Sequence, residues 1–290
     1  LVTLRPGDEL AFAQTLTYGS DDFIRSTTRI NLPMSEQLAA SLSYNHTQRD
    51  GYVDSLYSGK DLGAFESDAA RLALRWLPSE SFTADYAFDW SRRRSNTATS
   101  QMVQVRPTQI GLGGRFYQQL AAVSSPERMQ ALPLVEDRDG EHSSDASGHA
   151  LTMEWRPAAD LTVKSITSFR TWEEDEPGNS FGDIFVEANT VLNGATGSYV
   201  PAGQRVANFF ATRKGEQDQW SQELQLFGSA FGDRLTYTVG AFYFSEEAEE
   251  ANPQAYVLPA LFAFGRLPLA TQGFLCADFA SPAPCFGKSV

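Results

Sequence analysis

Residues 69–91 read AARLALRWLPSESFTADYAFDWS, and the spacing of their apolar side chains decides the fold class. Apolar and polar residues alternate on both sides of the short segment Pro78–Glu80. The apolar positions are Ala70, Leu72, Leu74 and Trp76 before this segment, and Phe82, Ala84, Tyr86, Phe88 and Trp90 after it. A period of two residues is typical of a β-strand with one apolar and one polar face. The stretch therefore predicts a β-hairpin with a tight turn at residues 78–80.

The same alternation recurs along the chain and predicts about nine strands. Near the C-terminal end, for example, Leu224 and Leu226 alternate with Glu223 and Gln225. The predicted strands lie at about 9–18, 23–32, 38–49, 67–77, 82–92, 148–157, 161–173, 216–228 and 234–245. No helical period competes with this pattern, so the sequence predicts an all-β protein.

The connections between these strands alternate between short and long. Tight turns are predicted at 33–36, 78–80, 157–159 and 230–233, and long polar loops at 50–66, 93–147, 174–215 and 246–290. Loops of more than about 12 to 15 residues are uncommon in compact soluble domains. Outer-membrane barrels have short periplasmic turns at one rim and long extracellular loops at the other. We therefore predict one incomplete domain over residues 1–290, an antiparallel up-and-down transmembrane β-barrel segment.

Periodicity alone does not identify the solvent, because a soluble β-sandwich also alternates. The aromatic residues favour a membrane, since they lie near strand ends, as two interfacial girdles require. The predicted girdles are Trp76, Trp155 and Phe227 before the short turns, and Tyr44, Trp90 and Trp172 near the long loops. A second packed layer over Leu72, Leu74, Tyr86 and Phe88 would contradict this interpretation.

Composition excludes two other classes of protein. The 290-residue chain has a formal net charge of -13, which opposes nucleic-acid binding because that requires clustered Lys and Arg. No stretch approaches the roughly 18 to 20 apolar residues of a membrane-spanning helix. A helical membrane protein and a nucleic-acid-binding protein are therefore not expected.

Several stretches resemble the barrel of TonB-dependent receptors. Val2–Pro6 (VTLRP) resembles the junction between the plug domain and the first barrel strand, and Leu72–Pro78 (LALRWLP) resembles a following hairpin. Gln219–Leu226 (QWSQELQL) and Val239–Phe244 (VGAFYF) resemble a later hairpin of that family. The similarity is distributed over roughly residues 1–250 rather than concentrated in one motif.

This resemblance implies an outer-membrane receptor that uses energy relayed by TonB to take up a scarce ligand. The implied ligand is an iron–siderophore chelate, cobalamin or an oligosaccharide. The implied partners are outer-membrane lipid, lipopolysaccharide and the TonB system, the last through a plug region that is not within residues 1–290. We expect the sequence to be part of a longer chain with further strands, because bacterial barrels have an even number.

Two other functions remain open from the sequence. A passive porin or an outer-membrane adhesin uses the same wall without a plug, and a secreted soluble β-sandwich binding module shares the alternation. No hydrolase, nucleotide-binding or metalloprotease motif is present, so neither enzymatic activity nor a cofactor is expected. For His46, His142 and His149, solvation in loops or at strand ends is predicted rather than metal binding.

Candidate site residues are the charged members of the polar rows. We predict that they face the lumen of the barrel, with wetting or ion pairing as the simpler role. They are Arg71, Arg75, Asp85, Glu154, Arg156 and Glu223. The two cysteines, Cys276 and Cys285, lie nine residues apart and are expected to form a disulfide, with two free thiols as the alternative.

Overall fold

The fold is seen in a computed structural model that describes residues 5–55, 61–96, 101, 103–104, 124–132, 141–185, 191–193, 205–232 and 234–259. Every regular element in these ranges is a β-strand. No described segment forms a helix that is long and apolar enough to cross a membrane.

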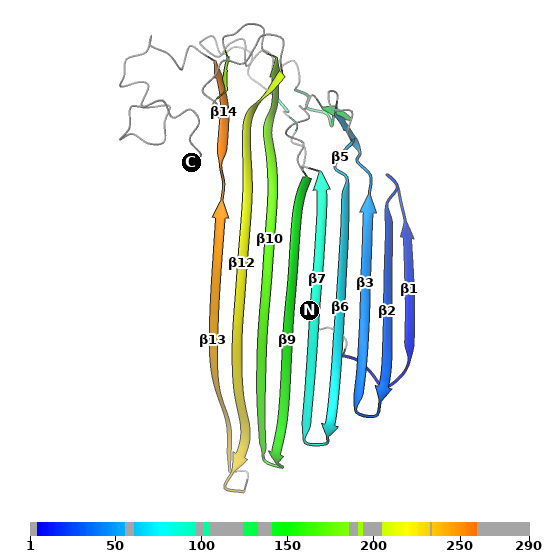
Figure 1. The fold of residues 1–290 in the computed structure, drawn as a ribbon, viewed down its shortest axis with the longest axis vertical. Coiled ribbons are helices and arrows are strands. Elements are labelled where there is room, and N and C mark those ends of the chain that lie inside the picture. Colours follow the sequence, from blue (N-terminus) through cyan, green and yellow to red (C-terminus); the bar gives the residue numbers. More distant parts are fainter. Residues whose placement is uncertain are drawn as a thin grey trace, which may run out of the picture.

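Nine long strands form one antiparallel sheet, as predicted (Figure 1). They are β1 (Ala11–Tyr18), β2 (Ile24–Ser35), β3 (Leu38–Arg49), β6 (Phe65–Ser79), β7 (Phe82–Asn96), β9 (Glu141–Ala158), β10 (Leu161–Phe185), β12 (Arg205–Ala230) and β13 (Leu235–Ala251). Each long strand pairs with the long strand that follows it in the chain, so the sheet is an up-and-down meander. Within the described residues β1 and β13 do not pair with each other, and the barrel is not closed.

Short strands extend this sheet and form a second one. β11 (Val191–Asn193) and β14 (Gln254–Pro259) continue the long sheet, with β14 pairing to β12. β4 (Val53–Ser55), β5 (Asp61–Leu62) and β8 (Ala131–Leu132) form the separate small sheet, where Val53 and Leu62 are buried against Met129.

The tight turns lie together at one end of the sheet (Figure 1). They occupy residues 36–37, 80–81, 159–160 and 231–234, within a few residues of the predicted positions. In the last turn Phe231 has φ 59° and Gly232 has φ 65°. Left-handed backbone is easy for glycine but unfavourable for a bulky residue such as phenylalanine.

We expect Phe231→Asn to stabilise the protein, because asparagine tolerates the left-handed region. The Phe231 ring is 78% exposed, so its removal costs little packing. The expected gain is about 0.5 to 1 kcal/mol in the free energy of unfolding, measured by urea titration of the complete protein in lipid vesicles. A lower unfolding midpoint for the variant would mean that the ring stabilises the turn.

The predicted long loops are wrong at their boundaries. β10 continues to Phe185 and β12 begins at Arg205, although residues 174–215 were expected to be one loop. At the end of the sheet opposite the tight turns, β7, β9 and β13 also extend beyond their predicted bounds. The reason is that the acidic run Glu173–Glu176 puts carboxylates on both faces, so the alternation that reveals a strand is interrupted.

Directly paired residues of antiparallel strands share a face, so the register assigns side chains to two faces. The face that we call the apolar face includes Phe12, Leu16, Leu42, Tyr44, Leu72, Leu74, Trp76, Phe82, Tyr86, Phe88, Trp90, Leu151, Trp155, Phe169, Trp220, Leu224 and Tyr243. The opposite side is the charged face. Phe227 and Trp172 lie on the charged face, so their predicted place in the girdles is wrong.

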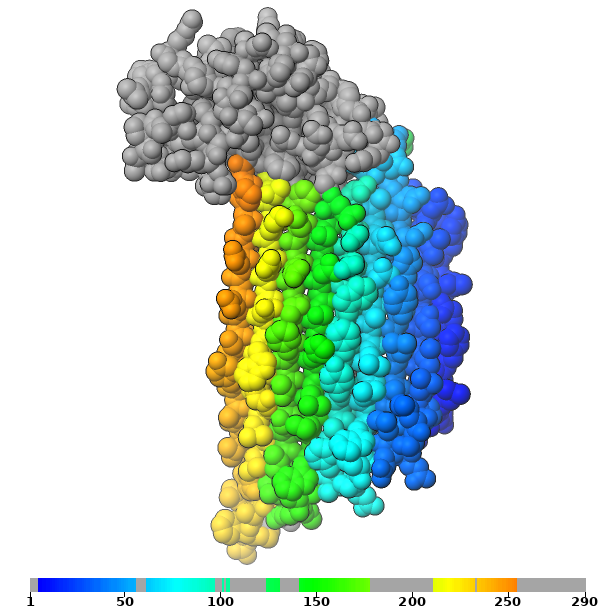
Figure 2. All heavy atoms as spheres, in the orientation of Figure 1, coloured from blue at the N-terminus to red at the C-terminus, as the bar shows by residue number. Residues whose placement is uncertain are grey.

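No second layer covers the long sheet in the described part of the chain, and Figure 2 shows its strands side by side as one wall. Leu42 is 44% exposed and Trp155 50% exposed. In the described ranges the buried hydrophobic core consists of Ala40, Val53, Leu62 and Ala73. The layer that would have contradicted the membrane interpretation is therefore absent over Leu72, Leu74, Tyr86 and Phe88.

Candidate functional site

The charged face holds an open groove over β2, β3, β6 and β7. Its volume is about 580 Å³, and its charged lining residues are Arg25, Arg29, Arg71 and Asp89. Arg29 is opposite Ser43, and Ser43 is opposite Arg71, so the register sets these side chains in a row across three strands. Three guanidinium groups and one carboxylate give the groove a positive charge, although the whole chain has a net charge of -13.

Asp89 is the carboxylate at the edge of this groove, and two arginines share it. Its Oδ1 lies 3.8 Å from Arg71 Nη1, and its Oδ2 accepts a 2.5 Å hydrogen bond from Arg170 Nη2. A Cβ atom at Gly148 would lie 3.2 Å from Arg170 Nε and 3.4 Å from Asp89 Oδ1. The glycine between them therefore gives the arginine room to reach Asp89.

Asp85 forms a second charged group nearer the tight turns. Its carboxylate lies 3.9 Å from Arg75 Nε and 3.7 Å from Arg5 Nε. Because Arg5 precedes the first strand, this contact brings the N-terminal segment onto the charged face. Asn31 secures the same segment, since its Nδ2 donates to Gly7 O and its Oδ1 accepts from Gly7 N.

The comparison with known proteins gives matches among solved structures alone, since no family model and no curated protein matches the chain. The ferric preacinetobactin receptor BauA from Acinetobacter baumannii is 14% identical with a TM-score of 0.58, covering 88% of this chain and 34% of that chain. The ferric-catecholate import receptor Fiu from E. coli K12, closed form, is 12% identical with a TM-score of 0.57, covering 86% and 33% respectively. The chain thus spans about a third of the length of these receptors.

The chain has the barrel fold of TonB-dependent receptors. An open sheet of nine long strands agrees with a segment of this receptor barrel, as the sequence predicted. Both neighbours are described as receptors.

All six candidate site residues lie on the charged face of the receptor barrel, but not in one cluster. Arg71 lies in the groove and Arg75 beside Asp85. Farther along the sheet, Arg156 Nη2 lies 2.6 Å from Glu154 Oε1, and Glu223 accepts a hydrogen bond from Gln225. Four further charged residues of this face were not predicted as site residues, because their proximity depends on the strand register. They are Arg25, Arg29, Asp89 and Arg170. Cys276 and Cys285 lie outside the described residues.

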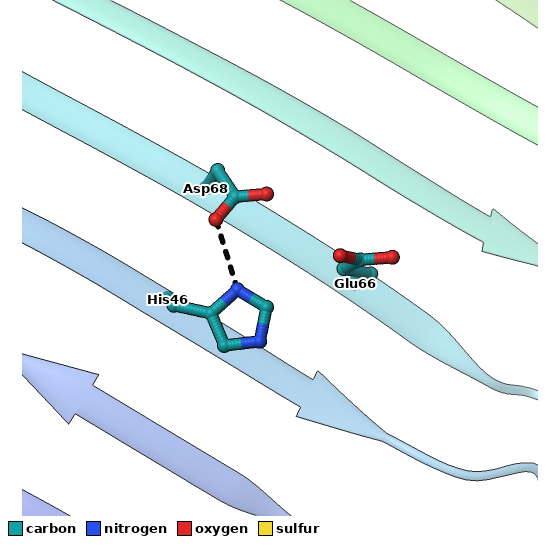
Figure 3. A group of neighbouring side chains, drawn as sticks. All are labelled: His46, Glu66 and Asp68. Carbon is teal, nitrogen blue, oxygen red and sulfur yellow. Dashed lines mark hydrogen bonds and ion pairs between the residues drawn. The ribbon is translucent and has the colours of Figure 1, made fainter.

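A polar cluster lies on the apolar side of the barrel, beyond Tyr44 toward the long loops (Figure 3). His46 Nδ1 is 2.9 Å from Asp68 Oδ1, and Tyr44 Oη donates to the same oxygen. The hydrogen bond to Asp68 raises the pKa of the His46 imidazole above its ordinary value. The hydrogen bonds from Tyr44 and His46 lower the pKa of the Asp68 carboxyl.

His46 lies near the end of β3, as predicted, whereas His142 and His149 lie in β9 rather than in a loop. Each has a partner, because His142 contacts Glu174 and His149 contacts the Tyr86 hydroxyl.

Proposed function

We propose that the chain is part of the barrel wall of an outer-membrane receptor that takes up a small anionic ligand with energy relayed by TonB. The observation that carries the proposal is the division of a single-layered sheet into an exposed apolar face and a charged face. The barrel fold shared with BauA and Fiu also supports a place in the wall of an outer-membrane receptor.

Hydrocarbon is the partner that suits the apolar face. Burial of a large apolar side chain contributes about 1.5 to 3 kcal/mol, and without a second protein layer these side chains gain it only from lipid or another chain. A sheet in lipid must close, because an unpaired edge leaves backbone N–H and C=O groups unsatisfied. Further strands are therefore part of the proposal, with lipid and lipopolysaccharide as the outer partners.

The groove on the charged face favours an anionic ligand over cobalamin or an oligosaccharide. Arg25, Arg29 and Arg71 present guanidinium groups, which bind carboxylates and phosphates through paired hydrogen bonds. BauA and Fiu are described as receptors for ferric preacinetobactin and for ferric catecholate. Among the ligands that the resemblance implies, an iron–siderophore chelate with negative charge fits this groove best.

The N-terminal segment supports the location of a plug. Arg5 and Gly7 contact Asp85 and Asn31 on the charged face, so the chain reaches β1 from the side that we propose encloses the lumen. A plug that begins before Arg5 would enter the barrel directly. The TonB system would act on the receptor through this plug.

The proposal is tested by growth of a deletion strain with iron supplied as catecholate, carboxylate or hydroxamate chelates. We expect the complete gene to restore growth on an anionic chelate, and a collapse of the proton gradient to stop uptake of the radioactive iron complex. Uptake that continues without the gradient would support a passive porin instead. A complete protein that stays monomeric without detergent would support the soluble sandwich.

A further inference from the structure

We propose that His46, Glu66 and Asp68 form a binding site for a first-row divalent metal ion such as Zn²⁺ on the outer side of the sheet. The three side chains offer one nitrogen and two carboxylate donors, whose ligand atoms lie within 4.8 Å of one another (Figure 3). This site is separate from the groove, because the cluster and the groove lie on opposite faces. The proposal does not depend on the uptake function.

The register of two neighbouring strands sets the donor geometry. His46 on β3 is directly opposite Asp68 on β6, and Gln48 is opposite Glu66, so all four side chains share one face. Zn²⁺ binds nitrogen and oxygen at about 2.0 to 2.2 Å in a tetrahedral arrangement, which places two donors on one ion about 3.3 to 3.6 Å apart. His46 Nδ1 and Asp68 Oδ1 are now 2.9 Å apart, a hydrogen-bond distance, so they would separate by about half an ångström to hold an ion between them.

The carboxylates offer donor positions to an ion, whereas both nitrogens of His46 have hydrogen-bond partners, Nδ1 with Asp68 and Nε2 at 3.3 Å from Gln48 Oε1. Tyr44 and His46 both bind Oδ1 of Asp68, and Oδ2 of that carboxylate accepts neither of these two hydrogen bonds. Glu66 is exposed, and rotation of its long side chain brings its carboxylate to the other two donors. An ion would displace the proton shared by His46 and Asp68, as metal binding commonly does.

The adjacent arginines are held by other carboxylates. Arg92 on β7 is directly opposite Asp68, but its Nε lies 2.7 Å from Asp145 Oδ1. Arg94 is opposite Glu66, and its Nε lies 3.4 Å from Glu141 Oε1. These ion pairs engage the Nε atoms of both arginines, although the charge of Arg92 still acts on the Asp68 carboxylate.

The combination of nitrogen and oxygen donors selects the class of ion. Imidazole suits Zn²⁺, Ni²⁺ and Cu²⁺, whereas Mg²⁺ and Ca²⁺ prefer oxygen alone. Three protein donors leave at least one coordination position for water or a lipid phosphate. We therefore expect binding of Zn²⁺ and of its spectroscopic substitute Co²⁺, and little binding of Mg²⁺.

The test is titration of the complete purified protein with Zn²⁺ by calorimetry and with Co²⁺ by visible absorption. We expect His46→Gln, Glu66→Gln and Asp68→Asn each to weaken binding by roughly tenfold or more, because loss of even an outer partner of a metal ligand costs about that much. Glu66→Gln alters an exposed side chain, so its effect is separable from a folding defect.

The matched control is His142→Gln, because His142 has one carboxylate neighbour, Glu174, at 3.0 Å and lies on the charged face. We expect this variant to retain wild-type affinity for both ions. Wild-type protein that binds no Zn²⁺, or a His46→Gln variant with unchanged affinity and an unchanged Co²⁺ spectrum, would overturn the proposal.

Discussion

Leu42→Arg in the complete protein is expected to lower the free energy of unfolding from lipid vesicles by about 2 to 4 kcal/mol. Leu42 lies on the apolar face between Ile30 and Leu72, and its side chain is 44% exposed in the sheet alone. A guanidinium at this position would have to leave water or distort the bilayer. Urea titration followed by tryptophan fluorescence measures the loss, and the folded fraction in the outer membrane is expected to fall with it.

The matched control is Ser41→Arg, one residue away on the same strand. Ser41 is paired with Asn31 and Ala73 on the charged face, which is the aqueous side in our proposal. We expect its cost to stay below about 1 kcal/mol, the usual range for substitutions away from the core. Equal costs for the two variants, or a larger cost for Ser41→Arg, would contradict the assignment of lipid to the apolar face.

The double variant Arg29→Ala and Arg71→Ala is expected to weaken binding of the anionic chelate that supports growth by about tenfold to a hundredfold. Hydrogen bonds to charged groups contribute about 1.5 to 3 kcal/mol, and each 1.4 kcal/mol is tenfold in affinity. The expected loss is smaller than two full charged hydrogen bonds would give. The reason is that the Arg71 side chain is 32% exposed, so water screens part of its charge. Equilibrium binding of the radioactive iron chelate to the purified receptor measures the effect.

Two single variants test whether charge in the groove is the cause. Asp89→Asn removes the one carboxylate of the groove lining, so we expect affinity to rise a few-fold. Arg156→Ala removes an arginine from the same face near the tight turns, where it pairs with Glu154, and we expect no change. A loss of affinity with Asp89→Asn would mean that Asp89 positions Arg71 and Arg170 rather than opposing the ligand.

The strands with one apolar and one charged face could be predicted because their side chains alternate strictly. Leu72 and Leu74 alternate with Arg71 and Arg75, and β6 forms where that pattern occurs. Toward the long loops this alternation is lost. Glu173–Glu176 therefore resembles a solvated loop in sequence, although it pairs with residues 213–216 inside β10 and β12.

The sites were less predictable than the strands because they depend on register. Asp68 lies 22 residues from His46 in sequence, and Arg170 lies 81 residues from Asp89. Nothing local indicates either contact, since a shift of one residue would move these side chains to opposite faces. Phe227 and Trp172 were assigned to the girdles because they lie near strand ends. That assignment did not consider the alternation of side chains along the strand, which puts both residues on the charged face.

The length of β10 and β12 has a consequence for the cell surface. They contain 25 and 26 residues, whereas a crossing of the hydrocarbon uses about 9 to 11. At about 3.3 Å per residue, each strand is roughly 80 Å long, so most of it would project beyond the bilayer. In the proposed membrane setting, an antibody raised against that projecting wall would recognise a folded epitope assembled from several paired strands, and a peptide copied from one strand would not reproduce it.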